Sequence, residues 1–248
     1  IMARRQRSRR QKQPTSGATS LSQPAFSSIQ NHLPALTPLS QDQLETIHHA
    51  SLKLLEETGM EVTSAEARAF YKGAGAEVDE ASELVKLPSE MVMDLLKTVP
   101  SRFTLTPTNP DRALTIGGNH IHFGMVSGAP NVHCALHGRR TGNFADYKNF
   151  IKLGQSFNIL HFFGNQTLAP NDLSVNTRHL DTTAVNLTYA DKVFLSMSIG
   201  RVRVRDAAEM LAIATGITLD ELAASPSCIT NVNINSPRKF DTEMAEAL

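Results

Sequence analysis

Apolar residues after position 39 recur at the spacing of amphipathic helices, interrupted by short apolar runs that are typical of strands. Ser40-Gln41-Asp42-Gln43 and Thr63-Ser64-Ala65-Glu66 both have the form of a capping box at a helix start. Gly59 stands where the first of these helices is expected to end. The pattern predicts helices over residues 40–58, 63–72 and 88–98, and a strand over residues 84–87.

Two further strands are predicted around the glycine pair Gly117-Gly118. Leu114–Ile116 and His120–Phe123 are apolar runs on either side of it, and such a pair separated by two glycines indicates a β-hairpin. Residues 39–142 are therefore expected to form an N-terminal region of helices and a β-hairpin.

After Gly142 the pattern changes to strands that alternate with helices. The expected strands are Ile159–Phe163, Val193–Met197 and Cys228–Ile234, and the expected helices cover residues 143–153, 177–189, 204–215 and those from 240 onward. This alternation predicts a parallel α/β sheet with crossover helices. Because the first strand lacks a following G-x-G-x-x-G turn, we expect a partial TIM-type (β/α) barrel over residues 143–248 instead of an open nucleotide-binding sheet.

The sequence ends within an amphipathic stretch, Glu243–Leu248, that carries no helix-terminating signal. We therefore expect the chain to be the N-terminal portion of a longer barrel. Three parallel strands cannot close a barrel, so such a fragment is expected to be inactive alone.

Residues 1–38 have the composition of a tail. Residues 1–13 hold six of the 24 basic residues and no acid, which leaves 18 basic against 24 acidic residues and a net charge of −6 in the rest of the chain. Residues 13–38 are rich in Ser, Pro and Gln. We interpret the whole segment as a disordered tail, and contact between its basic part and nucleic acid as the alternative function, that of a non-catalytic binding module.

The remaining composition narrows the class of protein. The sequence has no apolar run of 18 residues and no secretory signal pattern, which favours a cytoplasmic protein without a membrane segment. Cys134 and Cys228 form no C-x-x-C pair and are expected to be ordinary thiols. His120 and His122 would share one face of a strand, but the spacing supplies no third ligand, so we expect no metal.

Three long blocks carry a resemblance to a known family. They are LSQDQLETIHHASLKLLEETGMEV at 39–62, AGAEVDEASELVKLPSEMVMDLLKTVPSRFTL at 74–105 and HIHFGMVSGAPNVHCALHGRRTGNFADYKNFIKLG at 120–154. In this order and spacing they resemble the trimethylamine:corrinoid-protein methyltransferase family. The resemblance continues through weaker blocks to Leu248.

This resemblance implies a fold, an activity and a partner. The family has a TIM-type barrel and moves a methyl group from a methylated amine, such as trimethylamine or glycine betaine, to the reduced corrinoid of a partner protein. The resemblance therefore implies a methyltransferase of one-carbon metabolism that binds no cofactor directly and works with a corrinoid protein. Whether the chain also forms a homo-oligomer is left open.

Candidate site residues follow from the barrel expectation, since barrel active sites lie at the carboxyl ends of the strands. We expect substrate-binding residues at Asn165, Gln166, Asn233 and Asn235, with Ser198 and Ser236 nearby. Neutral amides can orient a methylated amine without trapping a charge, although loop Asn and Ser residues often satisfy their own backbone. No catalytic acid, base or nucleophile is indicated.

Charged and aromatic residues add weaker candidates. Arg139 and Arg140 precede a helix and could bind an anionic group, or Arg140 could form an ion pair with Asp146. Aromatic faces attract methylated ammonium groups, which makes Phe162, Phe163 and Tyr189 candidates. Phe162 and Phe163 lie on an expected buried strand and are more simply core residues.

Overall fold

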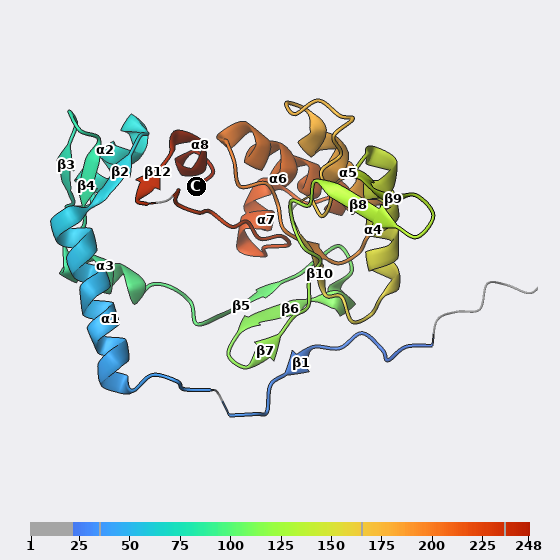
Figure 1. The fold of residues 1–248 in the computed structure, drawn as a ribbon, viewed down its shortest axis with the longest axis horizontal. Coiled ribbons are helices and arrows are strands. Elements are labelled where there is room, and N and C mark those ends of the chain that lie inside the picture. The colour runs from blue at the N-terminus through green and yellow to red at the C-terminus, as the bar shows by residue number, and fades with distance from the viewer. Residues whose placement is uncertain (1–21, 35, 165, 236) are drawn as a thin grey trace, which may run out of the picture.

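The computed structural model describes residues 22–248 apart from 35, 165 and 236. Residues 1–21, and with them the basic segment at 1–13, lie outside the described residues, as do Asn165 and Ser236. The chain is a mixed α/β protein, as predicted, and its course is shown in Figure 1. Its helices are α1 (Gln41–Lys53), α2 (Ala65–Gly73), α3 (Ser89–Leu96), α4 (Phe144–Ser156), α5 (Arg178–Tyr189), α6 (Arg201–Thr215), α7 (Leu219–Ala224) and α8 (Thr242–Ala245), with a π-helical turn η1 (Leu54–Thr58) and a 3₁₀ turn η2 (Pro110–Arg112).

The strands are short throughout the described part of the chain. They are β1 (Ile29–Gln30), β2 (Met60–Val62), β3 (Glu77–Asp79), β4 (Leu84–Lys86), β5 (Arg102–Leu105), β6 (Leu114–Gly117), β7 (His120–Ile121), β8 (Asn131–Cys134), β9 (Gly138–Thr141), β10 (Phe162–Phe163), β11 (Val193–Phe194) and β12 (Lys239–Phe240).

The first helix follows its local sequence signals. The Ser40 side chain accepts a hydrogen bond from the Gln43 backbone, and the Gln43 side chain accepts one from the Ser40 backbone, so the capping box is confirmed. The helix passes into η1 and ends at Gly59 at a φ of 70°, as predicted. A Cβ at residue 59 would lie 2.4 Å from the Val85 carbonyl oxygen, which explains the glycine.

A four-stranded sheet in the order β12-β2-β4-β3 lies beside α2 and α3 (Figure 1). Strands β2, β3 and β4 are antiparallel neighbours, and β12 adds in parallel with Lys239 opposite Glu61. Val62 and Val85 are fully buried and Phe240 is nearly so, and they form the core of this sheet. The apolar pattern predicts β4 but gives no sign that residues near 240 return to the N-terminal region.

The predicted hairpin of Leu114–Ile116 with His120–Phe123 is wrong. β6 pairs with β5, with Leu114 opposite Leu105, and β7 pairs instead with β1. A Cβ at Gly117 would lie 2.2 Å from the Ser101 carbonyl oxygen, so this glycine permits the close approach of the β5 segment. The glycine pair therefore turns the chain out of one two-stranded sheet and into another.

Residues 22–31 run along the outside of the fold, although their composition gives no signal for ordered structure. The Gln23 side chain accepts a hydrogen bond from the Asn158 backbone and donates one to the Ser156 carbonyl. Ile29 lies opposite Ile121 in the β1–β7 pair. These contacts hold residues 22–31 against the end of α4, the segment between α4 and β10, and β7.

Parallel pairing joins segments from three of the expected barrel units. Phe162 of β10 lies opposite Val193 of β11, and Leu195 forms a parallel bridge with Ile229. The order of Ile159–Phe163, Val193–Met197 and Cys228–Ile234 is thus the predicted one, but each strand is shorter. On the other side of β10, Gly124 forms a parallel bridge with Phe162.

None of the sheets in the described residues closes into a barrel, so the TIM-type barrel is not confirmed. The expected third strand shortens to one bridge at Ile229, because the chain after it leaves the sheet toward β12. An additional helix, α7, lies in the connection between α6 and this bridge.

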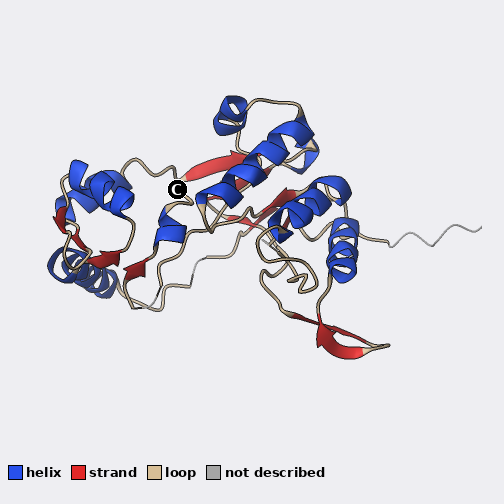
Figure 2. Ribbon diagram, turned by 90° about the horizontal axis from the view of Figure 1, so that it is seen from above, coloured by secondary structure: helices blue, strands red, loops and turns tan. Residues whose placement is uncertain are grey.

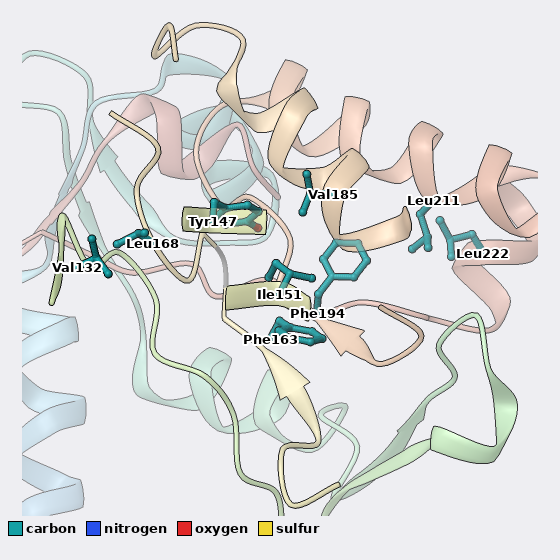
Figure 3. Packing of buried hydrophobic residues seen from close by; sticks show 9 residues of the cluster. All are labelled: Val132, Tyr147, Ile151, Phe163, Leu168, Val185, Phe194, Leu211 and Leu222. Atoms are coloured by element: carbon teal, nitrogen blue, oxygen red, sulfur yellow. The ribbon is translucent and has the colours of Figure 1, made fainter. Parts of the chain in front are cut away.

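Both faces of the β10–β11 pair are covered. Phe163 and Phe194 point into the main core, where α4 contributes Tyr147 and Ile151 (Figure 3). The other residues of this cluster are Val132, Leu168, Val185, Leu211 and Leu222. Phe162 and Val193 pack on the opposite face with Leu105 and Leu114 of the β5–β6 hairpin. Burial on both faces is typical of parallel strands, and the parallel pairing sets the edge at which their carboxyl ends lie.

Candidate functional site

The carboxyl ends of the parallel segments meet at one edge of the sheet. The segments at 124, 162–163, 193–195 and 229 run in the same direction, so residues 125–128, 164, 166–168, 196–198 and 230–233 leave from the same side. A second parallel bridge, between Ala129 and Leu168, extends this arrangement beyond β10. We call the loops at this edge the carboxyl-edge site.

Gln166 lies within the carboxyl-edge site, as predicted. Its side-chain nitrogen lies 3.9 Å from the Met197 sulfur, and its backbone carbonyl oxygen accepts a hydrogen bond of 2.8 Å from the Gly128 backbone. Its φ is 34°, a left-handed value that only one other non-glycine residue among those described, Glu83, shares. Residues held in this region cost of order 1–3 kcal/mol and cluster at functional sites.

Gly164 brings two of these loops into contact. A Cβ at residue 164 would lie 2.2 Å from the Ser127 hydroxyl oxygen and 2.7 and 2.9 Å from the carbonyl oxygens of Met125 and Val126. Gly164 is buried, so no free space lies on its other side to relieve that overlap. The missing side chain thus lets backbone carbonyl groups of residues 125–126 approach the carboxyl end of β10.

Thr230 joins the third segment to the same edge and was missed by the sequence analysis. Its hydroxyl donates a 2.9 Å hydrogen bond to the Met197 carbonyl oxygen. Met197 thereby lies between Gln166 and Thr230. Thr230 falls within an expected strand, where a threonine is common, so the sequence did not single it out. In the structure it follows Ile229, the last paired residue of this segment.

Asn233 and Asn235 lie farther along this loop. Asn233 is exposed, and its side-chain oxygen accepts a 3.4 Å contact from Asn231. Asn235 exchanges backbone hydrogen bonds with Lys239, and its side chain donates to Asp241. Asn235 therefore stabilises the turn that leads into β12, which is the structural alternative considered for these loop residues.

Arg140 forms a bidentate ion pair with Asp146, the alternative proposed from the sequence. Both guanidinium nitrogens donate to that carboxylate, and this contact holds the pKa of Asp146 below its usual value. Asp146 also closes the capping box of α4 with Asn143, so the predicted cap is confirmed. Arg139, in contrast, is exposed on the opposite face of β9.

The histidines gather at the opposite, amino-terminal end of the parallel segments. The rings of His120 and His122 are stacked at 6.2 Å, and His161 lies 5.4 Å from His122. Their nitrogens contact backbone groups, including the Ser27 carbonyl 3.0 Å from His161 and the Thr115 carbonyl 2.8 Å from His122. Among the described residues, no group of three or more His, Cys, Asp or Glu is arranged to hold a metal ion.

The aromatic candidates do not form a cage at this edge. Phe163 is fully buried in the main core and Phe162 packs on the other face, as the core interpretation predicts. Tyr189 is half-exposed at the end of α5 and carries the Lys152 ammonium 4.5 Å from its ring centre. Of the cysteines, Cys228 is partly buried, and burial raises the pKa of its thiol to about 11, which makes it unreactive.

The carboxyl-edge site is chemically neutral. Amide, hydroxyl, thioether and backbone carbonyl groups of Gln166, Thr230, Met197 and residues 125–126 are its polar atoms. Such groups can orient a small ligand through dipoles and soft contacts, whereas proton transfer would require an acid or base. The fold is that of an α/β protein in which neutral polar groups gather at the carboxyl ends of parallel strands.

The comparisons with known proteins give the family. The sequence model of the trimethylamine methyltransferase (MTTB) family matches residues 4–248, and the chain belongs to this family. A glycine betaine methyltransferase of Desulfitobacterium hafniense (strain Y51) is 32% identical over 216 residues, which cover 87% of this chain and 44% of that protein. The trimethylamine methyltransferase MttB of Methanosarcina barkeri (strain Fusaro / DSM 804) is 40% identical over 70 residues, 28% of this chain and 14% of that protein.

The chain thus spans less than half the length of the curated relatives that it matches. A helix with the length and apolar character needed to cross a lipid bilayer is not found in the described part of the chain.

Proposed function

We propose that the protein is a methyltransferase that takes a methyl group from a methylated amine and that the carboxyl-edge site orients this substrate. Family membership over residues 4–248 is the observation that carries the proposal. The neutral groups around Gln166 support it, because a cationic amine is held there by dipoles and is not fixed in a strong ion pair. The relatives reported above are methyltransferases, so the nucleic-acid-binding alternative is not proposed.

The proposed acceptor is the reduced corrinoid of a partner protein. In this reaction the electron pair of Co(I) forms the new cobalt–carbon bond, the nitrogen–methyl bond breaks, and the amine leaves with the electron pair of that bond. The step needs no protein acid, base or nucleophile, which agrees with the neutral chemistry of the site. The work of this chain is then to orient the nitrogen–methyl bond toward the acceptor and to exclude water.

We further propose a quaternary amine as the substrate class. The similarity to the glycine betaine methyltransferase extends over 216 residues, whereas that to the M. barkeri trimethylamine methyltransferase covers 70. A quaternary nitrogen has no proton to donate, but its positive charge still interacts favourably with the carbonyl and thioether groups of the site. Its methyl group is also activated without prior protonation.

The test is a methyl-transfer assay with the purified full-length protein and a corrinoid protein reduced to Co(I), followed by corrinoid absorbance. Glycine betaine and trimethylamine serve as alternative donors. We expect methylation with at least one of them and a higher rate with the quaternary amine. Loss of all activity with both donors, and with free cob(I)alamin as acceptor, would contradict the proposal.

Variants at the edge test the role of the site. Gln166→Ala and Asn233→Ala are expected to raise KM for the amine more than they lower kcat, because orientation by neutral groups acts in both ground and transition states. Gln41→Ala, a matched change on exposed α1, is the control and should leave both constants unchanged. Unchanged KM in Gln166→Ala would remove that residue from the site.

A further inference from the structure

The β8–β9 hairpin projects from the body of the protein. Its strands pair in antiparallel register from Asn131 opposite Thr141 to Cys134 opposite Gly138. Figure 2 shows this hairpin extending away from the helices, at the lower right of that view. Its tip is open to solvent, with Leu136 at 87% exposure. Leu136 thus presents an apolar side chain at the end of a projecting arm.

The hairpin is firmly anchored at its base. Val132 is buried in the main core, and Arg140 on the same face of the hairpin pairs with Asp146 of α4. The Gly142 backbone donates to the Pro130 carbonyl, and Asn171 donates to the same carbonyl from its side chain. The projecting strands are therefore held in a defined direction.

The base also places the hairpin beside the carboxyl-edge site. Ala129, two residues before β8, forms the parallel bridge with Leu168, and Gly128 donates its backbone hydrogen bond to Gln166. The hairpin leaves the fold from the same edge at which the substrate would be held. Any protein that approaches this site would meet the hairpin.

The outward face of the hairpin is basic. His133 and Arg139 are a cross-strand pair and both are exposed, and His137 lies at the tip beside Leu136. Residues 131–141 contain no acid, whereas the chain after residue 13 has a net charge of −6. Arg140 is paired with Asp146, so Arg139 is the exposed cation of this hairpin, and its charge on an otherwise acidic chain favours an acidic partner.

We propose that the β8–β9 hairpin is a docking arm for the methyl-accepting protein. The partner presents an acidic surface to Arg139 and His133, with an apolar recess that receives Leu136. This inference rests on the proposed methyltransferase function, because it identifies the occupant as the protein that must reach the carboxyl-edge site. The exposed Leu136 supplies the apolar contact, while the charge of Arg139 speeds and orients the encounter.

The experiment measures binding and transfer separately. Binding of a purified corrinoid protein from a glycine betaine methyltransferase system is compared for the unmodified protein, Leu136→Asp and Arg139→Glu. We expect Kd to rise at least tenfold in both variants, and binding by the unmodified protein to weaken with added salt. Ile213→Asp is the matched control, because Ile213 on α6 is 81% exposed, and should bind as tightly as the unmodified protein.

Transfer to free cob(I)alamin, which needs no docking, distinguishes the two proposals. Leu136→Asp should lose transfer to the corrinoid protein but retain transfer to free cob(I)alamin. Binding that is equally tight in all variants, or absent in the unmodified protein, would overturn the docking arm while leaving methyl transfer to free cob(I)alamin intact. Absence of transfer to either acceptor would overturn the proposed function, and the binding comparison would still decide the role of the hairpin.

Discussion

Replacing Gly164 by alanine tests whether the close approach of two loops shapes the carboxyl-edge site. The new methyl group would lie 2.7 and 2.9 Å from the carbonyl oxygens of Met125 and Val126. Ordinary contact begins near 3.4 Å, so these backbone atoms must move by about 0.5–0.7 Å. The Ser127 hydroxyl can rotate away, but the carbonyl groups cannot. Overpacking of this kind costs about 1–3 kcal/mol.

The displacement should also change substrate binding. Moving residues 125–127 stretches the hydrogen bond from the Gly128 backbone to the Gln166 backbone carbonyl, which holds the main chain that carries the Gln166 side chain. Misplacement of a positioning group by about 1 Å can cost 10²-fold in rate, so a shift of about half that is expected to raise KM on the order of tenfold. Denaturant unfolding gives the free energy of unfolding, and the methyl-transfer assay gives KM.

Gly73→Ala is the matched control, because no atom lies within 4 Å of a Cβ built there and the residue belongs to α2. Its stability should equal that of the unmodified protein or exceed it by up to about 1 kcal/mol. If Gly164→Ala unfolds at the same denaturant concentration and keeps the same KM, the packing argument is refuted.

Three further changes test parts of the fold that hold the site. Burial lowers the pKa of Lys192 to about 8, so the unfolded chain binds more protons than the folded chain between about pH 8 and 10.5. The free energy of unfolding should therefore rise with pH across that window by more than it does in Lys192→Met, as measured by denaturant titrations at several pH values. Arg140→Ala leaves Asp146 without its partner and should lower the melting temperature more than Arg139→Ala does; equal melting temperatures would argue against the ion pair. Tyr147→Phe removes the 3.0 Å hydrogen bond to buried Asn186 and should cost about 1–3 kcal/mol in chemical unfolding, and no loss would show that the bond is not needed.

Local signals in the sequence predicted the helices well. Ser40 and Asn143 cap α1 and α4 because each side chain bonds a backbone group three residues away, and such contacts depend on a few neighbouring residues alone. Gly59 ends its helix for an equally local reason. The alternation of strands and helices also predicted that the segments around Phe162 and Val193 are neighbouring parallel strands, because consecutive strands joined by a helix usually pair in parallel.

The pairing partners of the other strands were not predictable from the sequence. Leu114 pairs with Leu105 and not across Gly117, because alternation identifies a strand without naming its neighbour. The candidate site shows the same limit. Gln166 was found from its place after a strand, whereas Met197 and Thr230 resemble ordinary strand residues until the fold brings them together.

The parallel pairing of β12 with β2 has a consequence for the order of folding during synthesis. Lys239 contacts Glu61 from 178 residues farther along the chain (Figure 1). At about 5–20 residues per second, a ribosome needs about 9–36 s to make that interval, during which the outer edge of β2 has no partner. The charge on Glu61 protects this open edge in the meantime, because a charged side chain on a strand edge discourages pairing with other chains. The nascent N-terminal sheet is therefore completed only after the parallel strands between β10 and residue 229 have left the ribosome.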